Sequence, residues 1–265
     1  MSKSSIAIFI LFARLAFAQS PSELVDRMVQ NELAAAKNDH SHWMYRDSNS
    51  VQGKSTVYEV VQTPEGWVRR LISQNGKPPS SEEEKKNEEE IQKFLTDQNY
   101  RQQERAKLDK DTQKATELLG MLPKAFLYSF GAKRQNGMIN LSFRPNPNFQ
   151  PPTREAKVFH GMAGMLLINA KEMRLVKLSG HLIENIDFGG GILGKLNKGG
   201  TFEVDQADVG QGHWELTKLD VHISGHALFF ATIKEQQHEV MSDFHEVPPA
   251  TTLAEAVQML KAARS

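Results

Sequence analysis

Residues 200–224 read GTFEVDQADVGQGHWELTKLDVHIS, and this stretch decides the class of fold. Its two runs, 200–207 and 212–224, alternate apolar and polar residues on either side of a short turn. In the first run Phe202 and Val204 fall on one face, as expected when successive side chains of a strand point to opposite sides. The pattern predicts two neighbouring antiparallel strands.

The same alternation continues in both directions along the chain and is interrupted by turn residues such as Asn136-Gly137. Further strands are predicted at 43–47, 55–62, 67–74, 126–130, 138–143, 164–169, 174–188 and 227–236. Consecutive strands joined by short turns indicate an antiparallel meander.

Helical patterns occur at both ends of the chain. Ser20 and Glu23 form a capping box at the start of a helix that is predicted to reach about residue 37. Near the C-terminus, Thr251 or Thr252 caps a second helix and Glu255 completes its box.

Between the early and late strands lies a charge-rich segment, 82–117, which predicts one long helix or a helical hairpin. Its candidate N-caps are Ser80 and Ser81, and Gly120 and Pro123 are expected to end it. The segment is either a solvated insertion with a thin buried stripe or an arm that binds a partner.

These elements predict an α+β fold in which a curved antiparallel sheet, a half-barrel of about 9–11 strands, wraps around two or three helices. A charged helical insertion occupies about 80–120. The chain shows no internal repeat, so residues 19–265 are predicted to form a single domain.

The first 18 residues have the organisation of a secretory signal. A short polar start precedes the apolar run IAIFILFA at 6–13, and Ala16-Phe17-Ala18 places small residues where a signal peptidase cleaves. The apolar run is shorter than the roughly 20 residues that span a bilayer. We therefore expect cleavage after Ala18, a periplasmic or secreted protein, and no transmembrane anchor after cleavage.

Composition excludes several classes of site. The chain has 32 basic and 32 acidic residues, so there is no electrostatic case for nucleic-acid binding. It has no cysteine, which excludes disulfides, thiolate metal sites, a cysteine nucleophile and a lipoprotein anchor.

Three motifs resemble catalytic or ligand sites, but their residues, spacing or context do not fit such a site. The stretch GGGILGKL at 189–196 has phosphate-loop spacing, but Leu196 stands where Mg²⁺ needs a hydroxyl. His222 and His226 lie about 13 Å apart on a regular strand, too far to share one metal ion. His40 and His42 lie in a helix-to-strand loop where polar residues are expected.

Other members of these polar arrays are Asp39, Asp220 and Ser224. Neither a nucleophile elbow nor a His-Glu-x-x-His pair occurs. We predict no catalytic residue, no metal site and no cofactor.

Apolar residues at alternate strand positions are the remaining candidate site. They form either a packed core or a groove that the helices cover incompletely and that takes an acyl chain. The candidate lipid contacts are Ile139, Leu141, Phe143, Val176, Leu178, Leu182, Phe202, Val204, Trp214 and Leu216. Leu228 and Phe230 continue the pattern.

The segment GMINLSFRPN at 137–146 resembles the glycine, apolar strand and Arg-Pro segment of an early strand in the bacterial lipoprotein-localisation carriers, the LolA/LolB-like half-barrel superfamily. The order of signal, N-terminal helix, meander, interposed helix and late strands is similar as well. The resemblance implies a concave apolar surface that holds lipid or lipoprotein acyl chains.

The sequence thus leads to a first hypothesis of an exported, non-enzymatic protein that binds a lipid or a lipoprotein acyl chain. The alternative is a cell-envelope interaction or scaffold protein with a fully packed core, in which 80–117 contacts an envelope protein. A third hypothesis, a hydrolase with a dispersed site, has His222 as its best candidate.

Overall fold

The computed structural model describes residues 19–131, 137–188, 194–227 and 236–263. Four α-helices and one 3-10 helix are found there. They are α1 (Pro21–Asn38), α2 (Ser81–Thr96), α3 (Gln98–Ala125), the 3-10 helix η1 (Glu155–Gly161) and α4 (Leu253–Ala262).

The centre of the molecule is a ten-stranded sheet in which every neighbouring pair is antiparallel. From one edge to the other, its strands are β3 (Gly66–Gln74), β2 (Lys54–Thr63), β1 (His42–Val51), β13 (Gln236–Val247), β11 (His213–His222), β10 (Thr201–Gly210), β7 (Leu175–Leu182), β6 (Met162–Asn169), β5 (Met138–Pro145) and β4 (Phe126–Phe130). The edge strands β3 and β4 do not pair with each other, so the sheet is open. The predicted large antiparallel sheet is confirmed.

A second sheet has three short strands, β12 (Gly225–Ala227), β9 (Gly194–Leu196) and β8 (Ile186–Phe188). The predicted single strand at 174–188 is therefore wrong, because its first part is β7 of the large sheet and its last part is β8 of the small one. Leu182, Phe188 and Leu196 form a separate buried cluster here, which explains why the chain leaves the large sheet.

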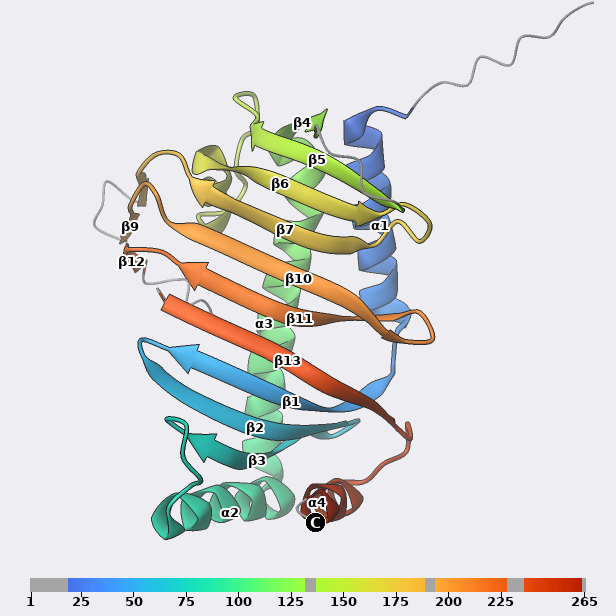
Figure 1. The fold of residues 1–265 in the computed structure, drawn as a ribbon, viewed down its shortest axis with the longest axis vertical. Coiled ribbons are helices and arrows are strands. Elements are labelled where there is room, and N and C mark those ends of the chain that lie inside the picture. The colour runs from blue at the N-terminus through green and yellow to red at the C-terminus, as the bar shows by residue number, and fades with distance from the viewer. Residues whose placement is uncertain (1–18, 132–136, 189–193, 228–235, 264–265) are drawn as a thin grey trace, which may run out of the picture.

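The strand β13 lies between β1 and β11 and joins the N-terminal strands to the late strands (Figure 1). The sequence did not predict it. Its residues QQHEVMSDFHEV are mostly polar on both faces and lack regular alternation. The strand predicted at 227–236 falls mainly on 228–235, outside the described residues, as do the candidates Leu228 and Phe230 and the predicted leader 1–18.

Capping boxes start three helices as predicted. The pairs are Ser20 with Glu23, Ser80 with Glu83 and Thr252 with Glu255. In each pair the hydroxyl accepts from the N3 backbone amide and the carboxylate accepts from the N-cap amide, which satisfies two otherwise free donors.

The charged segment forms two helices, α2 and α3. The expected end at Gly120 and Pro123 is wrong, because α3 runs through both residues to Ala125. Leu122 and Ala125 are buried in the main core, and this burial offsets the low helix propensity of Gly120 and Pro123. Figure 1 shows α3 crossing the whole sheet on one face, so this segment is a structural layer of the domain.

The helices cover opposite faces at the two ends of the sheet. Val60 and Val61 are adjacent in β2 and therefore point to opposite faces. Val61 packs with Val257 of α4 and Ile91 of α2, whereas Val60 packs with the aromatic cluster around Trp43. The sheet was expected to wrap around two or three helices, which places them on one face. Instead, α4 packs on the face away from α1 and α3.

The main core lies between α1, the end of α3 and strands β4 to β7. Its apolar members include Met28 of α1, Leu122 of α3, Leu141 of β5 and Leu166 of β6. A buried ion pair, Glu32 with Arg174, closes one side of this core.

Candidate functional site

A continuous row of cross-strand partners crosses the sheet on the face that α1 and α3 cover. Directly paired residues share a face, and the registers of neighbouring strands link one residue from every strand of the large sheet. From β4 to β3 the row is Phe130, Leu141, Leu166, Leu178, Val204, Leu219, Glu239, Asn49, Thr56 and Gln74. It is apolar as far as β11 and polar from β13 onward.

Within the apolar half, burial decreases along the row. Leu141 and Leu166 are completely enclosed, at 0% and 1% exposure, since α1 packs on them. Leu178, Val204 and Leu219 lie on the same face but are only partly buried. The middle strands therefore present apolar side chains that the protein itself does not fully cover.

Helix α3 is anchored by hydrogen bonds at its two ends, and its C-terminal part packs on α1 and the main core. At the N-terminal end, Arg101 Nη1 donates to the carbonyls of Phe94 and Leu95 at 2.8 Å, and Arg105 donates to the Pro64 carbonyl. At the other end, the Tyr128 hydroxyl donates to the Leu122 carbonyl at 2.8 Å. No residue of α3 before Leu122 is buried, so the part that crosses the middle strands has little packing of its own.

The polar half of the row contains a small hydrogen-bonded cluster around Glu239. Gln237 Nε2 donates to Glu239 Oε2 at 2.8 Å, and the carboxyl groups of Asp47 and Glu239 share a hydrogen bond. Burial raises the pKa of Asp47 to about 6, and the Glu239 carboxylate adds to this shift while Arg69 opposes it. Burial raises the pKa of Glu239 as well.

Two oxygen atoms of this cluster are enclosed without a partner. Asp47 Oδ1 and Asn49 Oδ1 are inaccessible to solvent and have no hydrogen-bond donor among the described residues. Enclosed polar atoms are nearly always paired with protein or water, so these two acceptors mark a place where a donor fits.

A second titratable group lies at the end of α1. His213 Nδ1 is 2.9 Å from Asp39 Oδ2, and this hydrogen bond raises the pKa of the imidazole. Burial raises the pKa of nearby Glu215 to about 7, and the Asp39 carboxylate adds to the shift.

These shifts predict that the fold loses stability as pH rises from about 5 to about 8. The folded state holds the Glu215 proton more tightly than the unfolded chain, whose glutamate pKa is about 4.3. Its contribution is therefore present at low pH and is lost as pH passes through about 7, and His213 acts in the same direction. Thermal unfolding is measured at constant ionic strength across this pH range. The decrease in Tm with rising pH should be smaller for Glu215→Gln than for the unaltered protein. An unchanged pH slope in that variant would contradict this assignment.

The structure brings together only some of the predicted lipid contacts. Ile139, Leu141, Phe143, Leu178 and Phe202 belong to or pack on one core cluster. Leu182 lies in the separate cluster beneath the small sheet. Trp214 lies beside Arg174 and donates from Nε1 to Glu172 Oε2 at 2.8 Å. Val176, Val204 and Leu216 are partly buried on their strands.

The predicted polar arrays are divided between different elements. Asp220 contacts His222 at 3.0 Å and His238 of the unpredicted β13 at 3.5 Å. Ser224 follows the end of β11, and His226 belongs to β12 of the small sheet. Asp39 pairs with His213, not with its neighbours His40 and His42. Among the described residues no group of metal-ligating side chains is placed to hold an ion.

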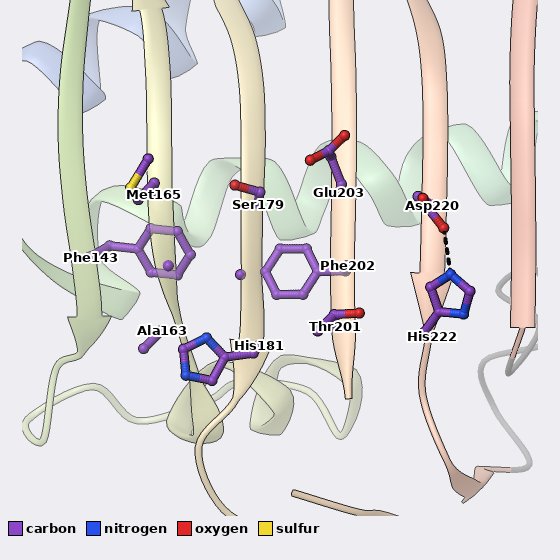
Figure 2. A pocket seen from close by; sticks show the side chains of 12 residues that line it. Phe143, Ala163, Met165, Ser179, His181, Thr201, Phe202, Glu203, Asp220 and His222 are labelled. Carbon is purple, nitrogen blue, oxygen red and sulfur yellow. Dashed lines mark ion pairs between the residues drawn. The ribbon is translucent and has the colours of Figure 1, made fainter. Parts of the chain in front are cut away.

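The face away from α3 has a shallow hollow of about 720 Å³, shown in Figure 2. Its floor is the paired glycines Gly164 and Gly180, and Met165 and Ser179 lie at its sides. Glu203 in its wall lies between Lys177 at 2.9 Å and Lys218 at 2.7 Å. Because these charges neutralise one another, the hollow selects a ligand by its charge less strongly than the row beneath α3 does.

Sequence reasoning missed Asp47, Asn49 and Glu239. Each is polar at a position that faces a helix, where the alternation rule expects an apolar residue. The available signal was Val240, Met241, Phe244 and Val247, apolar residues that β13 contains but that do not alternate regularly.

The fold and the row beneath α3 define an α+β protein with an open antiparallel sheet, whose helix-covered face carries apolar residues at one end and polar residues beside the aromatic cluster around Trp43 at the other. No protein-family model, curated protein or solved structure matches this chain. None of the described helices is long and apolar enough to cross a membrane.

Proposed function

We propose that this protein binds a long apolar chain, such as the acyl chain of a lipid or lipoprotein, between α3 and the middle strands of the sheet. The observation that carries this proposal is the partial burial of Leu178, Val204 and Leu219 beneath a helix whose centre has no buried residue. The protein acts by burial alone, without covalent chemistry, outside the cytoplasm.

The energetics are sufficient for useful affinity. Each methylene that leaves water contributes about 0.8 kcal/mol. Ten methylenes contribute about 8 kcal/mol, which exceeds the lower end of the roughly 4–15 kcal/mol that association costs, and each further methylene adds to this surplus. Because no residue of α3 before Leu122 is buried, a chain that lies beneath the centre of the helix displaces no packed core side chain of α3.

The test is native mass spectrometry of gently purified protein, followed by titration with a fluorescent fatty-acid analogue. A co-purified lipid or saturable probe binding is expected. A clean mass of the unliganded chain together with no probe binding would leave the alternative, a scaffold whose interior is filled by its own side chains and whose partner binds α2 and α3.

Val204→Asn should weaken binding of the probe about tenfold. The two side chains are similar in size, but the amide must give up its water when a chain covers it, at a cost of about 1–3 kcal/mol. The matched control is Asp205→Asn, one residue further along β10 on the opposite face. Equal affinities in both variants would place the ligand elsewhere.

A further inference from the structure

A second hollow of about 610 Å³ lies between α2 and α4, over strands β1 to β3. Figure 1 shows the two helices at this end of the sheet. The volume falls within the roughly 300–1,000 Å³ of small-molecule sites. One wall of the hollow is apolar and consists of Ile91 of α2 with Val257 and Leu260 of α4. Because α4 packs on the face away from α3, this hollow is separate from the row beneath α3.

The floor of the hollow is a charged row on a face that is otherwise apolar. Val61 and Val68 are cross-strand partners and pack in the cluster that α2 and α4 cover. Two residues further along the same two strands, and therefore on the same face, the partners are Glu59 and Arg70. Arg46 of β1 is the partner of Glu59 on its other side. Two arginines thus flank one glutamate.

Arg70 makes few of the hydrogen bonds that its guanidinium can donate. Only 15% of its side chain and 11% of that of Glu59 are exposed. Arg70 Nη2 donates to Glu59 Oε2, which uses one of the five N–H donors of a guanidinium. Arg70 Nε is inaccessible to solvent and has no acceptor among the described residues. Since an enclosed donor without a partner is costly, the floor favours a ligand that brings acceptors.

The charges around the hollow favour a single negative charge on that ligand. Among the described residues that line it, the basic ones are Arg46, Arg70, Lys85 and Lys261 and the acidic ones are Glu59, Glu84 and Glu88. Arg46 pairs with Asp243 at 3.2 Å and Lys85 with Glu89 at 3.9 Å, but both pairs are exposed and screened by solvent. The acidic lining residues repel the second charge of a phosphate dianion.

We propose that this hollow binds a monocarboxylate with a short apolar body. The carboxylate accepts from guanidinium donors of Arg70 that Glu59 does not use, and the apolar body lies against Ile91, Val257 and Leu260. Arginine and carboxylate groups form strong, planar and often bidentate pairs, and the wall adds the burial of apolar surface. This inference does not rest on the proposed function, because the two sites lie on opposite faces of the sheet.

The experiment is an NMR titration of the isotope-labelled full-length protein with hexanoate, hexanol and inorganic phosphate. It gives each Kd and the residues whose signals shift. Hexanoate is expected to bind about tenfold more tightly than either other probe, because hexanol lacks the charge and phosphate lacks the apolar body. The largest shifts are expected at Arg70, Ile91 and Leu260. Hexanol or phosphate binding as tightly as hexanoate would overturn the assignment of a monocarboxylate.

The double variant Glu59→Gln with Arg70→Gln tests the floor, since it removes both members of the buried pair and leaves neither charge alone. The Kd for hexanoate should rise about tenfold or more. The matched control is Arg69→Gln, the adjacent arginine, which lies 5.8 Å from the Tyr58 ring on the other face and should leave binding unchanged. Lys261→Glu, at the exposed end of α4, should raise the Kd about threefold and provides a test that leaves the buried pair intact.

Val204→Asn separates this site from the chain site of the proposed function, and it should leave the Kd for hexanoate unchanged. If it abolishes hexanoate binding, hexanoate occupies the chain site and the present inference is overturned while the proposed function stands. If the fatty-acid analogue binds and hexanoate does not, the inference fails alone. An unchanged Kd both in Lys261→Glu and in the double variant, shown to be folded by circular dichroism, also overturns it.

Discussion

Glu32→Ala is expected to lower the free energy of unfolding by about 3–5 kcal/mol, as is typical when one partner of a buried ion pair is removed. Glu32 of α1 accepts from Arg174 Nε at 2.9 Å, from Arg174 Nη2 at 3.0 Å and from the Leu175 backbone amide at 2.7 Å. Only 6% of the Glu32 side chain and 13% of that of Arg174 are exposed. The variant leaves the guanidinium and an amide enclosed without an acceptor.

Urea denaturation followed by circular dichroism measures this effect. Asp26→Ala is the matched control, because Asp26 is an exposed acid on the same helix with one contact, to Gln30. The control should change stability by less than about 0.5 kcal/mol. The double variant Glu32→Leu with Arg174→Met should recover most of the loss, since apolar residues can replace a buried pair. A loss below about 1 kcal/mol for Glu32→Ala would show that water replaces the missing carboxylate.

Local signals in the sequence predicted local structure well. The capping boxes at Ser20, Ser80 and Thr252 depend on residues three positions apart, so a single sequence contains all the information they need. The meander of late strands follows for the same reason, since β5, β6 and β7 pair with their neighbours in the chain.

The pairing of strands that lie far apart in the sequence could not be predicted from such local signals. β13 pairs with β1, whose residues lie about two hundred positions earlier in the chain, and nothing in either segment specifies the other. The face that α4 covers depends on which strands form the β3 end of the sheet. Because β13 was missed, the sequence could not place the first three strands beside the late ones.

The residues of the candidate site divide in the same way, into those that local patterns predicted and those that they did not. Leu178 and Val204 were predicted as ligand contacts because apolar residues at alternate positions mark a covered face. Asp47 and Glu239 were not, because polar residues on such a face are indistinguishable in sequence from residues on a solvated face. What distinguishes them is α3, which crosses both halves of the row (Figure 1).

Leu141→Ala is the second large effect, with an expected loss of about 2–5 kcal/mol in the free energy of unfolding. Leu141 is completely enclosed within the cluster that contains Met28 and Leu166. Its truncation therefore leaves a cavity that the surrounding helix and strands cannot fill. Although it was a predicted lipid contact, it is a core residue, and the affinity for an acyl-chain probe should change little in the protein that remains folded.

Leu178→Ala gives the opposite pattern, although Leu178 lies in the same row only two strands away. Because it is only partly buried in the unliganded protein, its truncation should cost less than half as much stability as Leu141→Ala. A bound chain would cover it, so the Kd for the probe should rise about tenfold, the equivalent of roughly two methylenes. Denaturation and probe titration of both variants measure the two effects separately. If both lose stability equally and neither changes the Kd, the boundary between core and ligand site does not lie between β6 and β7, and the row is packed interior throughout.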